Sequence, residues 1–175
     1  MQKITLTLAS ALLLAFGPTT GFAVEPSSVP LAPNGIAFPA DYPDWRVISI
    51  SHRVDNKTMR VILGNDVAIA AARSGKTNPW PDGSVLGKVV WKQAPEAHWP
   101  TAIAPKEFVH AEFMFKDTKK WSNTGGWGYA RWKGTQLMPY GKDASFAQEC
   151  VACHTPVKNR DWVFTDPAII PNMPK

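Results

Sequence analysis

Two cysteines, Cys150 and Cys153, occur in this chain, and His154 directly follows the second. The pattern Cys-x-x-Cys-His is typical of haem c attachment, in which both thiols add to porphyrin vinyl groups and the histidine reaches the iron. A disulfide this short closes poorly in relaxed geometry, although redox dithiols use it, and zinc would need further ligands at metal spacing. The motif therefore predicts one covalent haem c, with His154 as the iron ligand.

The N-terminus has the composition of an export signal. Lys3 precedes an apolar run over 4–16, and small residues end at Ala23. We predict a cleaved signal peptide over 1–23 and a periplasmic protein, because the run is too short to span a membrane stably. An uncleaved anchor is the alternative. No second apolar run is long enough to span, so we expect no stable membrane insertion.

Residues 24–44 are rich in Pro, Ala and Ser and are predicted to form an extended N-terminal arm. Residues 45–175 are then one haem domain. The formal charge of +5 is scattered along the chain. It favours an acidic redox partner or an anionic surface, and the absence of a dense basic cluster argues against nucleic acid.

Alternating and β-branched segments predict a mainly β fold, an antiparallel sheet with a few short helices and the haem attached near the C-terminus. Residues 93–106 are predicted to be a Pro-rich irregular connection. One predicted helix begins after Asn65 and ends at Gly75, and Asp143 caps another that leads into the haem motif. The predicted strands cover 45–54, 58–63, 84–92, 108–116, 127–132 and 161–165, and the predicted helices cover 67–73 and 144–151.

The ligand opposite His154 separates electron transfer from chemistry at the iron, since electron carriers use a strong sixth ligand such as Met or His. No candidate stands out, so we favour an open, five-coordinate iron. The candidates are Met59, Met114, Met138, Met173, His52, His98 and His110.

Lys88 lies in a predicted strand with apolar residues on both faces. A desolvated lysine loses its proton more readily, and the neutral amine is a nucleophile. The alternative is a lysine that extends to solvent from an edge strand.

Glu112 shares a strand face with His110 and Met114, where burial would tune a carboxylate as a distal proton acceptor. Alternatively, it pairs with a Lys or Arg on a solvated face. Arg60 is a further candidate for the same site, although a structural ion pair is its favoured role.

Seven stretches in order resemble the cytochrome P-460 family, whose relatives include the β-sheet cytochromes c prime. They are 42–46, 60–65, 81–88, 112–117, 126–128, the haem motif and 161–165. The resemblance implies an antiparallel β fold, usually a homodimer, with an exposed distal iron site. It implies hydroxylamine oxidation by members whose lysine is bonded to a porphyrin meso carbon. That lysine falls on Lys88, and the family's distal carboxylate aligns with Glu112.

Three functions follow from these features, in order of preference. The first is an enzyme that oxidises hydroxylamine and passes electrons to a redox protein. The second is a gas-binding protein for nitric oxide, as the resemblance to the β-sheet cytochromes c prime implies. The third is a plain electron carrier.

Overall fold

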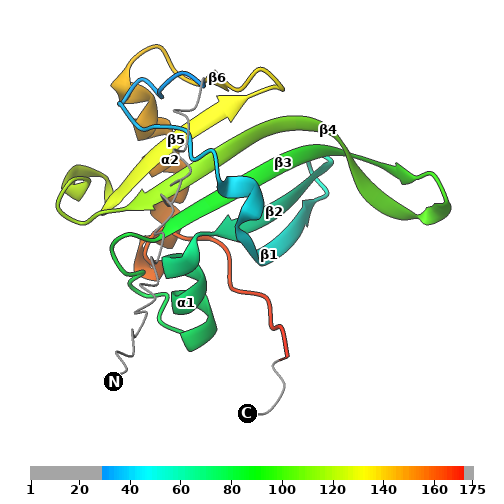
Figure 1. The fold of residues 1–175 in the computed structure, drawn as a ribbon, viewed down its shortest axis with the longest axis horizontal. Coiled ribbons are helices and arrows are strands. Elements are labelled where there is room, and N and C mark those ends of the chain that lie inside the picture. Colours follow the sequence, from blue (N-terminus) through cyan, green and yellow to red (C-terminus); the bar gives the residue numbers. More distant parts are fainter. Residues whose placement is uncertain (1–28, 172–175) are drawn as a thin grey trace, which may run out of the picture.

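The computed structural model describes residues 29–171. One antiparallel six-stranded sheet, with its strands in sequence order, dominates them (Figure 1). The predicted mainly β fold is confirmed. The strands are β1 (Arg46–Arg53), β2 (Thr58–Gly64), β3 (Val85–Glu96), β4 (Trp99–Lys116), β5 (Trp127–Lys133) and β6 (Met138–Pro139).

The predicted signal peptide and Met173 lie outside the described residues. Within the described part of the chain, no helix is both long and apolar enough to cross a membrane.

Helix α1 (Asp66–Ser74) lies beside one end of the sheet (Figure 1). The Asn65 side chain accepts a hydrogen bond from the Ala68 N–H, and Gly75 ends the helix with a left-handed φ of 71°. Asp143 caps a short 3-10 helix (Ala144–Phe146), which runs directly into helix α2 (Ala147–His154). The predicted helix therefore extends through the whole haem motif.

The prediction of an irregular connection over 93–106 is wrong. β3 and β4 continue through this segment as a long hairpin, which projects beyond the rest of the sheet (Figure 1). In the described residues, β2 pairs with β3 only as far as Lys92, and β5 pairs with β4 only from His110. The projecting strands thus each have a free edge, where a proline lacking its N–H is tolerated.

The prediction of a last strand over 161–165 is also wrong. Asp161 and Trp162 have φ values of 51° and 65°. Two consecutive left-handed residues turn the chain and are incompatible with a strand.

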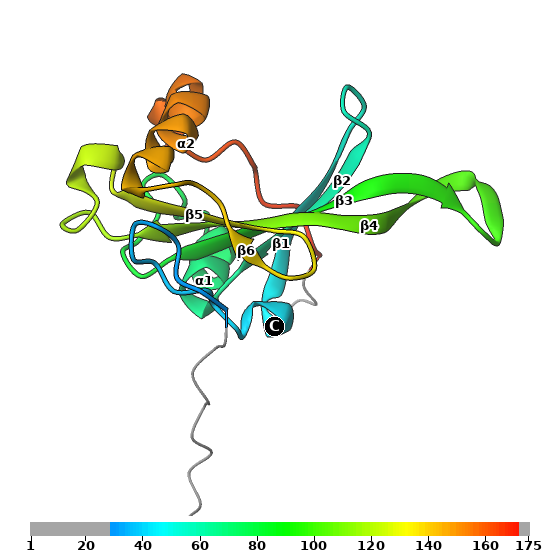
Figure 2. The ribbon, with the colours of Figure 1, turned by 90° about the horizontal axis from the view of Figure 1, so that it is seen from above.

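The two faces of the sheet have different coverings (Figure 2). Residues 29–44 form only one short 3-10 helix, Tyr42–Asp44, and lie on the opposite side of the sheet from α2. Phe38 of this segment packs edge-on against Phe113 and Trp132 of the sheet. The arm thus seals one face with aromatic side chains and leaves the other face for α2.

Candidate haem site

Helix α2 carries the three residues of the attachment motif. Cys153 and His154 lie three and four residues after Cys150, so both flank Cys150 on one side of the helix. Cys150 is partly buried, Cys153 is exposed, and both are free thiols. Burial raises the pKa of the Cys150 thiol to about 11, so this thiol is neutral at physiological pH.

His154 is oriented by the segment that follows α2. Its Nδ1 lies 2.6 Å from the Trp162 carbonyl oxygen, which can only accept, so the proton is on Nδ1. This tautomer leaves Nε2 available to a metal. The ring centroid lies 5.4 Å from that of Tyr129 and 5.1 Å from that of Phe164. Burial lowers the pKa of His154, which favours the neutral imidazole that binds metals.

The sheet face that carries Tyr129 is arranged in rows across the strands. Tyr129 pairs in register with Met114, and Met114 with Leu86. The next row, about 7 Å along the strands, is charged, because Lys88 is opposite Glu112 and Glu112 is opposite Arg131. The row beyond it contains Arg60 and His110. His154 therefore stands over the first row, with a charged surface beginning at the second.

Glu112 is the centre of the charged row. Its carboxylate forms an ion pair with Lys88, lies 2.5 Å from Arg131 Nε without hydrogen-bond geometry, and lies 3.3 Å from His110 Nε2. Burial alone would raise the pKa of Glu112, but the charges of Lys88 and Arg131 and the other contacts lower it to about 2. The carboxylate is therefore ionised and pairs with cations, as one of the two sequence hypotheses proposed, but its side chain is only 18% exposed and so does not lie on a solvated face.

The environment of Lys88 matches neither of the two sequence hypotheses fully. Its side chain is 31% exposed, so it is not isolated in apolar surroundings, and its ammonium pairs with Glu112. The structural ion pair expected for Arg60 is absent from the described residues, and the Arg60 Nε is buried with no hydrogen-bond partner there. Burial lowers the pKa of Arg60, and the charge of Arg53 adds to this effect.

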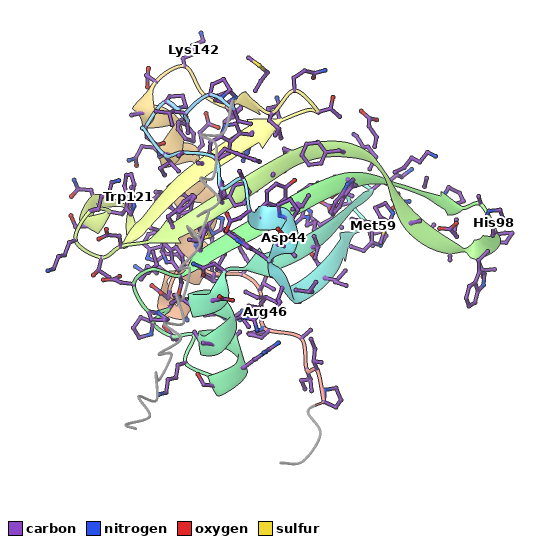
Figure 3. The ribbon with its side chains drawn as sticks, viewed as in Figure 1. Asp44, Arg46, Met59, His98, Trp121 and Lys142 are labelled. Carbon is purple, nitrogen blue, oxygen red and sulfur yellow. The ribbon has the colours of Figure 1, made fainter. Side chains whose placement is uncertain are left out.

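The candidate sixth ligands are dispersed. Met114 and His110 lie on the face that carries α2, whereas Met59 and His52 pair with each other on the opposite face of their strands. His98 is at the tip of the projecting β3–β4 hairpin (Figure 3), and Met138 is 58% exposed on β6. Among the described candidates, the fold thus brings only Met114 and His110 to this face.

The residues on this face fit a haem. Two free thiols and an imidazole with an available Nε2 form the donor set that covalent haem c requires. The Tyr129 hydroxyl and the Arg60 Nε are buried and have no hydrogen-bond partner within the described chain. Such orphaned polar atoms indicate that a further group with polar atoms belongs there.

The comparison with protein families agrees with this geometry. The model of the cytochrome P460 family matches residues 39–165, most of the chain. The chain belongs to the cytochrome P460 family. Membership implies a haem cofactor and hence a cytochrome with an iron site. The search of curated proteins found no match.

Sequence reasoning missed Arg131 as part of this P460-type site. Arg131 is two residues from Tyr129 in a predicted strand and so lies on the same face, but no sequence pattern assigned that face to the haem. What the sequence could not supply was the register that places Arg131 opposite Glu112.

Proposed function

We propose that this cytochrome is a periplasmic enzyme that oxidises hydroxylamine. Cys150 and Cys153 hold haem c covalently, and His154 Nε2 ligates the iron. Bound haem would supply an iron able to bind the hydroxylamine nitrogen and to accept electrons, which an external electron-accepting redox protein would remove. The observation that carries the proposal is the Lys88–Glu112 ion pair on the sheet face beside His154.

Glu112 accepts the protons that hydroxylamine loses on oxidation. It is ionised, and His110 and Arg131 hold its carboxylate in place. Because its pKa is about 2 while all its cationic partners are present, it is a weak base in that state. Loss of one cationic partner would make it a stronger base.

Lys88 is the cationic partner of Glu112 whose positive charge we expect to be lost. A bond from its Nζ to a porphyrin meso carbon replaces one N–H and one C–H bond. This two-electron oxidation requires an external oxidant, such as a peroxide. Lys88 must first lose a proton, and Glu112 is the carboxylate in contact with its Nζ. A nitrogen attached to an aromatic ring carries no positive charge at neutral pH, so the crosslink raises the pKa of Glu112 towards the range of a useful base.

Arg60 supplies a fixed positive charge in the row beyond Lys88, with an unpartnered buried Nε in the described structure. We assign it to stabilising negative charge that develops on the bound substrate. The proposal includes a homodimer, which the family resemblance implies. The exposed Trp99 and Ile103 on the projecting hairpin support an association surface.

Nitric oxide binding without turnover is the second candidate. It follows if Lys88 keeps its proton and its pairing with Glu112, because an ammonium engaged by a carboxylate is not a nucleophile. In that case the haem remains an ordinary c-type group with an open iron.

Mass spectrometry of haem peptides from the mature holoprotein tests the proposal. We expect the Lys88 peptide to carry porphyrin, and the protein to consume hydroxylamine steadily with an artificial electron acceptor. Lys88→Arg keeps the cation beside Glu112 but removes the amine, so both properties are lost while thioether-bound haem remains. Lys92→Arg, an exposed lysine on the same strand, is the matched control.

A porphyrin-free Lys88 peptide in haem-loaded protein that does not consume hydroxylamine would overturn the enzymatic proposal. Nitric oxide binding by that same protein would then support the second candidate.

A further inference from the structure

A second charged pair is buried behind His154. Lys116, the last residue of β4, and Asp161, in the turn after α2, have side chains that are 2% and 9% exposed. The Lys116 Nζ donates to Asp161 Oδ1 at 2.6 Å and also lies 4.9 Å from the ring centroid of Trp127. Burying two charges is costly even when they are paired, so such a pair is weak evidence for a purely stabilising role.

Asp161 is held from three directions. Besides Lys116, the backbone N–H of Trp80 donates to Asp161 Oδ2 at 2.8 Å, and the Trp127 indole N–H donates to the Asp161 carbonyl oxygen at 2.8 Å. These contacts join the turn to β4, β5 and the loop before β3. They maintain a backbone that L residues adopt rarely, since Asp161 and Trp162 both have positive φ values.

This turn determines where the Trp162 carbonyl lies. The carbonyl oxygen is 2.6 Å from His154 Nδ1. The Trp162 side chain is equally confined, because a Cβ added to Gly125 would lie 2.2 Å from its Nε1. The position of the acceptor for His154 therefore depends on residues from several strands.

We propose that the Lys116–Asp161 pair positions His154, through the Trp162 carbonyl, and thereby sets the electron donation of this imidazole to the iron. The inference rests on the proposed ligation of iron by His154. A hydrogen bond from Nδ1–H to a fixed acceptor orients the ring, selects the tautomer and raises the basicity of Nε2. Greater donation stabilises the ferric state.

Asp161→Asn is the informative variant. Asparagine tolerates a left-handed backbone, and its amide oxygen can still accept from Trp80. The substitution leaves the Lys116 ammonium unpaired, so the double variant Lys116→Met/Asp161→Asn, which buries no charge, is prepared in parallel. Asp166→Asn is the control, because it removes an 83% exposed carboxylate that pairs with Arg160 in the same segment.

The readouts are the iron–histidine stretching frequency of the ferrous holoprotein by resonance Raman and the reduction potential. In both Asp161 variants we expect the frequency to fall and the potential to become more positive. At a fixed solution potential, the ferrous-to-ferric ratio should rise roughly tenfold, a factor taken from the smaller effects that outer-shell partners have on metal affinity or activity. Asp166→Asn should match the wild-type protein in both.

Either folded, haem-loaded Asp161 variant with wild-type frequency and potential would overturn the inference. Failure of both variants to fold would also overturn it, because the pair would then be a folding element only. A wild-type holoprotein without an iron–histidine band would instead refute a five-coordinate iron ligated by His154, and with it the proposed function.

Discussion

Lys88 on β3 and Glu112 on β4 stand directly opposite each other in the sheet, and their side chains form an ion pair on the face that carries α2. The same carboxylate also contacts Arg131 and His110. A sheet face beneath a helix is ordinarily apolar, and here the residues nearest His154 follow that rule, with Tyr129 and Met114 in the first row. The site is defined by the change from apolar side chains in the first row to charged side chains in the second.

Replacing the carboxylate tests the assigned proton acceptor. Glu112→Gln keeps the size of the side chain but cannot accept a proton, so we expect hydroxylamine turnover to fall by about 10²–10⁴-fold. The covalent haem content should stay unchanged, because Glu112 is not part of the attachment motif. Steady-state assays on haem-normalised protein measure this effect. Glu107→Gln, an exposed position on the same strand, serves as the control, and equal losses in both variants would contradict the assignment.

Acid should weaken the fold in two windows. Burial, together with nearby cations, lowers the pKa of His110 from 6.5 to about 4. The folded state thus binds fewer protons than the unfolded state, and stability present above pH 6.5 is lost as the pH falls to about 4. The pKa of Glu112 is lowered from 4.5 to about 2, so its contribution is lost as the pH falls from 4.5 to about 2.

The variant His110→Gln isolates the first window. It should flatten the decline in the free energy of unfolding between pH 6.5 and 4.5 by on the order of 2 kcal/mol. Denaturant titrations at a series of pH values measure this decline. Parallel curves for the variant and the wild-type protein would show that His110 is not the responsible group.

The two cysteines should contribute separately to haem attachment. Cys153→Ala leaves one thioether, so haem should remain bound on a denaturing gel while its reduced pyridine spectrum shifts to that of a haem with one free vinyl group. Prepared together with Lys88→Arg to exclude the proposed crosslink, the double variant with Cys150→Ala should release its haem into acidified acetone. Retention of haem by the double variant in that extraction would contradict attachment through these thiols.

The N-terminal arm should matter for stability and not for the iron site. Phe38→Ala removes a ring, 7% exposed, that packs on Phe113 and Trp132. We expect a loss of about 3–5 kcal/mol in the free energy of unfolding and an unchanged haem spectrum, because the arm and α2 lie on opposite faces (Figure 2). Leu31→Ala, 59% exposed in the same arm, should cost far less. A spectral change in Phe38→Ala would show that the two faces are coupled.

Local chemistry made several elements predictable. The cap at Asn65, the left-handed Gly75 and the alternation along the strands depend on neighbours in the chain, and the structure confirms them. The wrong predictions concern two segments in which strand pairing or a tertiary contact overrode the local conformational preference of the residues. Pro95 and Pro105 lie in a two-stranded ribbon whose free edges tolerate proline. Residues 161–165 form a turn and not a strand, because Asp161 is hydrogen-bonded to Lys116, 45 residues earlier in the chain.

By itself, the sequence determined the sheet-rich fold class and the family, and it indicated the haem donor set, since strand periodicity and a five-residue motif are short-range properties. Only the tertiary structure decided which charges meet. Strand register brought Arg131 to Glu112, and an irregular turn brought the Trp162 carbonyl to His154. Such contacts join residues distant in the chain, and their energies depend on burial and on distances of a few ångströms, which no local pattern encodes.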